Sequence, residues 1–299
     1  MKIVPLIVTF NRLEKLKITI DKTLSQTFYR VVIINNASTD GTAEWLDEIA
    51  CPRVTVINLN HNIGGAGGFK YGSKWIAENL RCDWVLFYDD DAFPCDNFIT
   101  RMHQFKPTEH DVYTCKVIDL NGELCRMNIP WLRYPRSVYE TILYIFKPSI
   151  FIVSDNKLKI QRVMSVSFVG MLINYNTLVD YYNKINEDLF IYYDDVYFSW
   201  HLIQKGIKIA YIPELIMYHD IVRNGDSGIP SWKIYFLVRN IFYAKKEFGD
   251  KSPFSKIYII ARVTKYLFLS LKQKDKFNNI TMFIRGVRDG FILNRQSKR

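Results

Sequence analysis

The first 110 residues alternate apolar, strand-like runs with segments that have the periodicity of helices, and this alternation constrains the fold most strongly. The apolar runs are KIVPLIVTF, RVVIIN, RVTVINL and DWVLFY, and polar or glycine-containing segments separate them. Repeated strand–helix–strand units form a mostly parallel sheet with helices on both faces. Continuously apolar runs suit strands that are buried on both sides. The sequence therefore predicts an α/β fold.

Beyond residue 110 the pattern is less regular. Residues 111–129 predict a β-hairpin with its turn at Asn121-Gly122. Residues 130–160 are aromatic and irregular, and we expect an insertion that faces the substrate. The segment EDLFIYYDDVYFSWHLIQKG predicts a strand that ends in acidic residues and leads into a helix stopped by Gly206. A last strand-like segment, IKIAYIPELIMYHD, ends near His219.

The positive charge of the chain is concentrated in its last quarter. The net charge is +10, but residues 1–231 carry 24 basic and 26 acidic residues, whereas residues 232–299 carry 16 basic and 4 acidic residues. We therefore expect an acidic or neutral working domain over residues 1–225 and a basic, helical region over residues 226–299. That region contains no recognised nucleic-acid-binding motif, so we expect no nucleic-acid partner.

The stretch SPFSKIYIIARVTKYLFLSLKQKDK has the pattern of a basic amphipathic helix. Its apolar face is predicted to hold Ile260, Val263, Leu267 and Leu271, and its opposite face Arg262, Lys265, Lys272 and Lys276. Such helices commonly lie on anionic membrane surfaces, which we expect here. The alternative is a helical cap that packs its apolar face on the catalytic domain.

Composition and segment lengths exclude several classes of protein. Hydrophobic residues make up 48% and charged residues 23%, as in globular proteins, which excludes disorder and collagen-like repeats. No run of 18 uncharged apolar residues predicts a transmembrane helix, and the N-terminal apolar run is too short for a signal peptide. The five cysteines include no CxxC pair. We expect a reduced, cytoplasmic protein.

Three consecutive carboxylates follow the apolar run DWVLFY. In open α/β sheets ligands bind beyond the carboxyl ends of the strands, where Asp89, Asp90 and Asp91 are predicted to lie. Clustered carboxylates repel one another unless a cation is present, and divalent cations bind oxygen ligands that they share with substrate phosphates. An acidic surface turn is the alternative, but the position after a strongly apolar strand favours a metal site.

Two further features add candidate residues. Asp194 and Asp195 follow another apolar segment at the start of a predicted helix, where acids also serve simply to cap a helix. Two acidic clusters at strand ends indicate one metal site and one general base. His219 follows a third apolar stretch, and an imidazole there would complete a carboxylate-bound Mn²⁺ site. A purely structural histidine is the alternative.

The segment NIGGAGGFK contains four glycines, Gly64, Gly65, Gly67 and Gly68, before a predicted helix. It matches neither the dinucleotide fingerprint nor the P-loop. Glycines allow a backbone to approach a ligand closely, and a helix N-terminus attracts negative charge. A tight turn with close helix packing is the alternative, although it needs fewer glycines.

Four features taken in order resemble one family. VTFNR, NNASTDGT, the strand-terminal DDD and the later Asp-Asp before a helix are similar to family 2 glycosyltransferases of the GT-A fold, over about residues 1–220. The combination of NIGGAGGF, DDDA, GMLI and YYDDVYFS resembles the galactofuranosyltransferase branch, whose donor is UDP-galactofuranose. Many members of that branch have Trp before the Asp pair, whereas this chain has Tyr192 and Tyr193. The resemblance therefore leaves room for a different acceptor preference.

The resemblance implies a role for each motif. It implies that Thr9, Asn11 and Arg12 contact the nucleotide, that Asn36 stands where many relatives have an acid that holds uracil, and that the glycine segment lies at the donor. Asp89 and Asp91 would hold Mn²⁺ or Mg²⁺ with His219, and Asp90 would support the site or contact the ribose. Asp195 matches the catalytic base and Asp194 is its neighbour.

The resemblance also implies a reaction and partners. The implied reaction is the inverting transfer of galactofuranose from a UDP-sugar to a polyprenyl-linked or polysaccharide glycan, at the inner face of the cell membrane. Alternatives are another donor (dTDP-rhamnose, UDP-galactopyranose or UDP-glucose), a non-catalytic sugar-binding subunit, and a nucleotidyltransferase. The last is disfavoured because VTFNRLEKL lacks the glycine-rich loop of that class. No pattern in the sequence indicates an oligomeric state.

Overall fold

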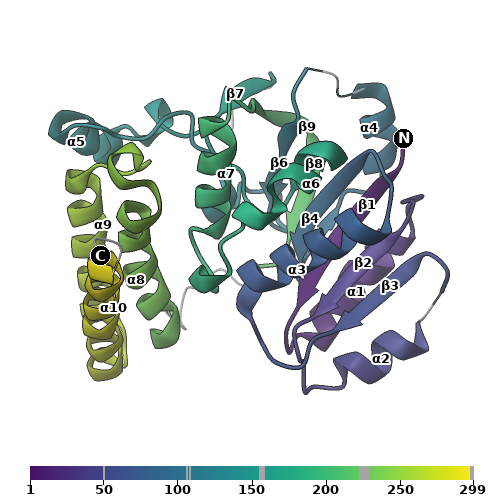
Figure 1. Ribbon diagram of the computed structural model, residues 1–299, viewed down its shortest axis with the longest axis horizontal. Helices are drawn as coiled ribbons and strands as arrows, with labels where there is room; N and C mark the ends of the chain where they lie inside the picture. Colours follow the sequence, from purple (N-terminus) through teal and green to yellow (C-terminus); the bar gives the residue numbers. More distant parts are fainter. Residues whose placement is uncertain (50, 106, 108, 155–158, 222–228, 297–299) are drawn as a thin grey trace. The chain divides into compact units, whose positions relative to one another are not determined.

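The computed structural model describes residues 1–49, 51–105, 107, 109–154, 159–221 and 229–296, and the chain divides into two compact units (Figure 1). Unit 1 comprises Met1–Leu132, Val153–Phe190 and Asp194–Ile221. Unit 2 comprises Arg133–Ile152, Ile191–Tyr193 and Val222–Arg299. Two short segments from the middle of the chain therefore belong with the C-terminal helices.

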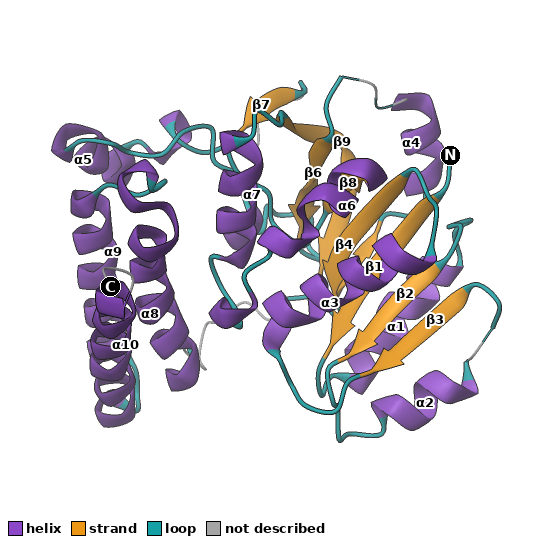
Figure 2. Ribbon diagram, viewed as in Figure 1, coloured by secondary structure: helices purple, strands orange, loops and turns teal. Residues whose placement is uncertain are grey.

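Unit 1 is built on a mixed sheet whose N-terminal half is parallel (Figure 2). Among the described residues the strand order is β3-β2-β1-β4-β8-β6-β9-β5, and β7 pairs with β9. Strands β1 to β4 are parallel, as the sequence predicts, and β8 pairs antiparallel with both β4 and β6. The strands are β1 (Ile3–Thr9), β2 (Val31–Asn35), β3 (Val54–Asn58), β4 (Trp84–Asp89), β5 (Ala92–Pro94), β6 (Val112–Ile118), β7 (Gln161–Val163), β8 (Met171–Asn174) and β9 (Ile209–His219).

Helices cover both faces of this sheet because the apolar side chains of each strand alternate between two cores. In β1, Ile3 and Ile7 join the core beneath α1, whereas Val4 and Leu6 join the core beneath α3. The first core also takes side chains from α2 and α4, and the second from α6 and α7. These helices are α1 (Leu13–Leu24), α2 (Thr42–Glu48), α3 (Gly64–Asn79), α4 (Phe98–Phe105), α6 (Tyr175–Tyr181) and α7 (Asp194–Gln204). The α/β prediction is confirmed.

Two local predictions need correction. The turn at Gly122 forms, but the return arm of the predicted hairpin is reduced to a single bridge between Ile118 and Leu124, because the chain enters the 3₁₀ helix Arg126–Asn128. The strand predicted before Asp194 is absent: Glu187–Leu189 forms a 3₁₀ helix. The apolar run there consists of aromatic residues in a bent loop, so apolar content alone gave a wrong strand.

Unit 2 contains α5 (Val138–Phe146), α8 (Ser231–Phe248), α9 (Lys256–Lys272) and α10 (Lys276–Gln296). Helices α8, α9 and α10 run side by side and α5 lies across one end of them (Figure 1). Gly286 and Gly290 bring α10 close to α8, since a Cβ at Gly290 would lie 2.5 Å from the ring of Phe242. The helical C-terminal region is confirmed. Among the described residues, no helix combines the length and apolar character needed to cross a membrane.

The predicted apolar face of α9 is split between the interior and the surface. Val263 and Leu267 pack against a core that includes Val238 of α8 and Phe283 of α10. Ile260 and Leu271 are exposed instead. The exposed apolar stripe of α9 is therefore shifted around the helix from the predicted one.

Candidate active site

The three consecutive carboxylates lie where the parallel half of the sheet ends. Asp89 is the last residue of β4 and pairs in register with Val8 of β1, so it lies beside the end of the first strand. Asp90 and Asp91 follow in the turn to β5, and both side chains are buried. Ligands of α/β sheets bind at this edge. The sheet therefore gathers the carboxylates at the expected position.

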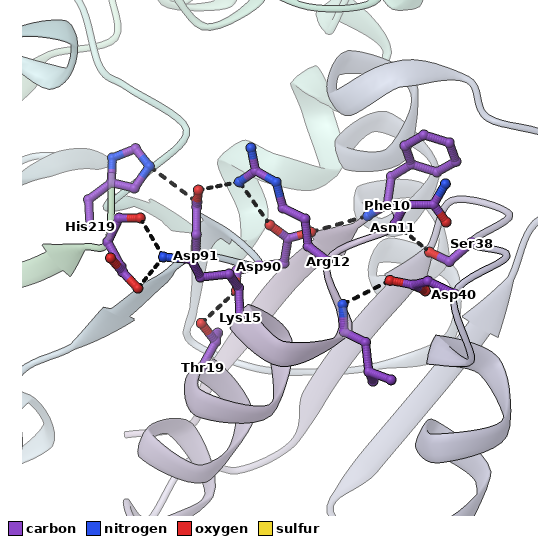
Figure 3. A network of polar contacts seen from close by, with 12 residues as sticks. Phe10, Asn11, Arg12, Lys15, Thr19, Ser38, Asp40, Asp90, Asp91 and His219 are labelled. Carbon is purple, nitrogen blue, oxygen red and sulfur yellow. Dashed lines mark hydrogen bonds and ion pairs between the residues drawn. The ribbon is translucent and has the colours of Figure 1, made fainter. Parts of the chain in front are cut away.

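Arg12, in the loop after β1, contacts two of these carboxylates (Figure 3). Its Nη1 pairs with Asp91 Oδ2 and lies 3.5 Å from Asp90 Oδ1. Asp90 is further held by the backbone N–H of Phe10, 3.2 Å from its Oδ2, and Thr19 Oγ1 donates to its carbonyl oxygen at 2.8 Å. Arg12 thus balances part of the negative charge of the carboxylate cluster in this structure.

His219, the last residue of β9, completes this group from the other half of the sheet (Figure 3). Its Nε2 lies 3.2 Å from Asp91 Oδ1, and its Nδ1 lies 3.0 Å from Asn128 Oδ1. The Asn128 amide donates in turn to Ser167 Oγ at 2.7 Å, which leaves its oxygen to accept from the imidazole Nδ1–H. The arrangement directs Nε2 at Asp91. Asn128 was not predicted, because nothing in its local sequence links it to a residue so far along the chain.

Burial and mutual repulsion change the acidity of the cluster. Burial, reinforced by the charges of Asp91 and Asp90, raises the pKa of Asp89 to about 7. Burial and the charge of Asp91 raise the pKa of Asp90 to about 6. Burial also opposes ionisation of Asp91, but its contacts with His219 and Arg12 outweigh this and lower its pKa. Asp91 is therefore the carboxylate that ionises most readily, whereas ionisation of Asp89 and Asp90 is disfavoured unless a cation stabilises it.

The carboxylates also change the pKa of the His219 imidazole. Burial alone would lower the pKa of His219, but its hydrogen bond with Asp91 and the charges of Asp91 and Asp89 raise that pKa to about 9. His219 and Asp91 therefore form a buried charged pair, with Arg12 as a second cation on Asp91.

A metal site is chemically possible here but is not preassembled. Among the residues that the structure describes, no three His, Cys, Asp or Glu side chains are grouped as a formed metal site. The donors nevertheless fit Mn²⁺ or Mg²⁺, because two carboxylates and an imidazole meet at the sheet edge and two carboxylates of the cluster have raised pKa values. Asp91 would have to exchange its contact with Arg12 for the metal.

The second acidic pair begins α7. Burial, the charge of Asp195 and a smaller contribution from Asp89 raise the pKa of Asp194 well above its usual value. The influence of Asp89 indicates that the two acidic groups lie within electrostatic range of each other. Burial raises the pKa of Asp195 to about 6, although it accepts a hydrogen bond from Val196 N at 2.7 Å. A buried carboxylate with such a pKa suits a general base near neutral pH.

A strained loop leads into this pair. Phe190, Tyr192 and Tyr193 all have φ between 66° and 69°, a conformation that bulky L-residues rarely adopt. Within unit 2, the fully buried Asn240 of α8 donates through Nδ2 to the carbonyl oxygens of Ile191 and Tyr192, at 2.7 and 3.1 Å. Such strain persists only where surrounding contacts enforce it.

Asn240 is itself held in place by its neighbour. The Nε of Arg239 donates to Asn240 Oδ1 at 2.8 Å, which fixes the orientation of the amide. The Tyr193 hydroxyl lies 2.7 Å from that of Tyr266, again within unit 2. Asn240 was not predicted, because a polar residue in the middle of a helical pattern is expected to lie at the surface.

The glycine segment is used mainly for close packing. Gly64 has φ +75° and a Cβ there would lie 2.2 Å from the carbonyl oxygen of Phe190. A Cβ at Gly68 would lie 2.6 Å from Val8 of β1, and one at Gly67 2.7 Å from Ile63. Gly65, in contrast, has open space around it at the start of α3. Gly65 is therefore the glycine whose position leaves room for a ligand.

Thr9, Asn11 and Asn36, the remaining residues predicted to contact the donor, link the loops that follow β1 and β2. Thr9 ends β1 and its carbonyl oxygen accepts from Asn36 N at 2.9 Å. The Asn36 side chain is buried and bonds to the glycine segment, donating to Gly64 O at 2.9 Å and accepting from Ile63 N at 3.0 Å. Asn11 accepts from Thr39 N at 2.7 Å. These residues organise one loop cluster, and their contact with a nucleotide stays a prediction.

Sequence comparison identifies the family. Residues 6–163, more than half of the chain, match Glycosyl transferase family 2. The chain belongs to glycosyltransferase family 2. The match spans β1 to β7 and includes Asp89, Asp90 and Asp91, and the protein is accordingly a glycosyltransferase.

Solved structures show the same fold at low sequence identity. TarS 1–349 from S. aureus is 17% identical with a TM-score of 0.56, and the alignment covers 99% of this chain and 89% of that one. GalNAc-T7, solved with UDP, GalNAc and Mn²⁺, is 13% identical with a TM-score of 0.61 and coverage of 96% and 54%. A longer TarS structure from S. aureus is 17% identical with a TM-score of 0.55 and coverage of 98% and 49%. The chain thus spans about half the length of the two larger proteins.

No curated protein sequence matches this chain. The solved structures, at these identities, establish the GT-A-like fold alone. They do not identify the galactofuranosyltransferase branch, the donor or the acceptor.

Proposed function

We propose that this glycosyltransferase transfers galactofuranose from UDP-galactofuranose to a hydroxyl of a glycan acceptor, with inversion at the anomeric carbon. The observation that carries the proposal is that unit 1 holds two acidic groups, Asp89–Asp91 at the end of β4 and Asp194–Asp195 at the start of α7, with Asp90, Asp91 and Asp194 buried. The first group suits a cation that would bind the diphosphate of a donor, and the second suits proton transfer from an acceptor.

The donor would bind over the ends of β1 and β4. Thr9, Asn11 and Arg12 line the loop after β1, and open space around Gly65 at the start of α3 would accept a phosphate oxygen. Asn36 would contact the base only through groups that its bonds to the glycine segment leave free. Asp90 would support the site or contact the ribose.

Asp195 would act as the general base. Its carboxylate would accept the proton of the acceptor hydroxyl as that oxygen bonds to the anomeric carbon, while the bond from that carbon to the UDP oxygen breaks. One such displacement inverts the anomeric centre. Asp194, whose pKa is raised furthest by burial and by Asp195, would remain protonated beside it and leave Asp195 as the ionised member of the pair.

Asp89, Asp91 and His219 would hold Mn²⁺ or Mg²⁺. When bound, the metal supplies positive charge that stabilises the departing diphosphate. The raised pKa of Asp89 supports a cation at this place, and GalNAc-T7, a protein of the same fold, was solved with Mn²⁺. On metal binding, Arg12 would be released from Asp91 to contact the diphosphate.

The acceptor would be a polyprenyl-linked or polysaccharide glycan, reached by the protein from the inner face of the cell membrane. The strongly basic C-terminal helices support contact with an anionic membrane surface.

One assay tests both the inversion at the anomeric carbon and the choice of donor. The purified protein with Mn²⁺ and a membrane-extract acceptor is given UDP-galactofuranose in one reaction and dTDP-rhamnose in a parallel one, and the anomeric configuration of any product is read by NMR. A β-linked product from the α-linked donor supports the proposal. Retained configuration, or transfer from dTDP-rhamnose alone, would contradict it.

A further inference from the structure

Helix α5 turns its apolar side chains outward. Five of its nine residues are apolar or aromatic side chains that are 49–77% exposed. At about 100° per residue they occupy one arc of about 120°. We call this set the α5 apolar face. It consists of Val138, Tyr139, Ile142, Ile145 and Phe146.

The opposite side of α5 is the side that packs within unit 2. Thr141 is buried there, and the ring of Tyr144 lies 6.1 Å from the ring of Tyr258 of α9. An ordinary surface helix buries its apolar stripe and exposes its polar one. In α5 the apolar side chains are exposed instead, and exposed apolar patches of this kind mark sites of interaction.

The helix is well formed in this orientation. Ser137 caps its N-terminus by accepting from Glu140 N at 3.1 Å. Glu140 forms an ion pair with Arg133, whose guanidinium also lies 4.4 Å above the ring of Phe151. These contacts fix which side of α5 faces outward.

Exposed cations lie next to both ends of α5 and at the start of α9. Arg136 precedes the helix, Lys147 follows it, and Lys256 begins the adjoining α9, and all three are exposed. Unit 2 as a whole contains 20 Lys and Arg residues against 6 Asp and Glu residues, a net charge of +14. Apolar and aromatic side chains bordered by cations match the boundary between the headgroups and acyl chains of an anionic bilayer.

We propose that the α5 apolar face inserts into the surface of an anionic lipid bilayer, with the bordering cations at the headgroups. The inference deepens the membrane contact of the proposed function, which the sequence assigned only to residues 226–299. Ile257 and Ile260 on the first turns of α9 are also exposed.

Co-sedimentation of the full chain with vesicles tests the proposal. One vesicle preparation contains phosphatidylcholine and phosphatidylglycerol, and the other contains phosphatidylcholine alone. The test variant is Ile145→Asn with Phe146→Asn. The matched control is Ile18→Asn with Leu120→Asn, which removes two apolar side chains of unit 1 that are 50% and 55% exposed.

We expect the wild type and the control to bind the anionic vesicles, and the α5 variant to bind them roughly tenfold or more weakly. Circular dichroism confirms that all three proteins are folded. Equal vesicle binding by the α5 variant and the wild type would overturn the proposal. So would a wild-type dimer in sedimentation velocity that the α5 variant converts to a monomer, because a second copy would then cover the face.

Release of UDP from the donor in solution separates this inference from the proposed function. The α5 variant should release UDP at the wild-type rate without vesicles. If vesicle binding depends on α5 but the protein turns over no donor, this inference stands and the proposed function is refuted.

Discussion

The Nε2 atom of His219 lies 3.2 Å from Oδ1 of Asp91, which brings the end of β9 against the carboxylates that follow β4. Asn128 fixes the imidazole from its other side at 3.0 Å. Outer contacts of this kind orient metal-binding histidines. The pair is the point at which the two halves of the sheet contribute to one site.

Asn128→Leu should weaken Mn²⁺ binding because the imidazole loses the acceptor that fixes its Nδ1–H. We expect the dissociation constant for Mn²⁺ to rise by about 10–100-fold. Electron paramagnetic resonance of free Mn²⁺ measures this without an activity assay. His103→Ala, on the exposed surface of α4, is the control and should leave Mn²⁺ binding unchanged. Unaltered binding in Asn128→Leu would remove His219 from the metal site.

Asp195→Asn should abolish proton transfer while preserving the shape of the side chain. We expect kcat to fall by about 10²–10⁴-fold, with a small change in the KM for the donor. Asp188→Asn, in the exposed 3₁₀ helix that precedes the loop, should have wild-type kcat. Wild-type transfer by Asp195→Asn would refute the assignment of the base.

The pH dependence of transfer follows from the pKa of Asp195, which burial raises to about 6. A general base must be ionised, so kcat should be constant above that pH and fall tenfold per pH unit well below it. The measurement is kcat at saturating donor and Mn²⁺ from pH 5 to 8, values that bracket the pKa of about 6. A rate that rises as the pH falls through this range would indicate a general acid instead.

Asn240 should act as a positioning residue for Asp195, because it holds the carbonyl oxygens of Ile191 and Tyr192 in the strained approach to α7. Asn240→Asp removes the Nδ2 donor with little change of volume. We expect kcat to fall by up to roughly 100-fold with an unchanged donor KM, and the pH midpoint of kcat to shift.

Tyr266→Phe provides the comparison for Asn240→Asp, since it removes only the hydroxyl that meets Tyr193 and should affect kcat less. If Asn240→Asp lowers thermal stability but leaves kcat and the pH midpoint at wild-type values, its role is structural only.

The glycine segment offers a matched pair of substitutions. Gly68→Ala would place a Cβ 2.6 Å from Val8, and we expect the free energy of unfolding to fall by about 1–3 kcal/mol. Gly65→Ala meets no atom within 4 Å and should change that free energy by about 0.5 kcal/mol at most. If a donor phosphate lies there, Gly65→Ala should instead raise the donor KM. Denaturant unfolding and donor titration distinguish the two effects.

The sequence allowed the α/β fold and the positions of Asp89–Asp91 and His219 to be predicted, because apolar runs that end in polar residues mark the ends of buried strands. It failed at Phe190–Tyr193, where an equally apolar run forms a strained loop. The conformation there depends on Asn240, which is distant in the chain, and on the hydrogen bond between the hydroxyls of Tyr193 and Tyr266. Periodicity carries no information about such contacts.

Other site features also depended on tertiary contacts. The partnership of Arg12 with Asp91 and of Asn128 with His219 arises only when separate loops meet at the sheet edge. The outward orientation of the α5 apolar face was likewise hidden, since an amphipathic pattern does not state which face is buried.

The most direct test of the account is UDP release from a panel of donors with Mn²⁺. UDP-galactofuranose, UDP-galactopyranose, UDP-glucose and dTDP-rhamnose are offered with a lipid-linked acceptor extract, and free nucleoside diphosphate is measured for the wild type and Asp195→Asn. The account predicts acceptor-dependent release from UDP-galactofuranose, which EDTA abolishes and Asp195→Asn reduces by about 10²-fold or more. Release that is equal in the two proteins, or that persists in EDTA, would contradict it.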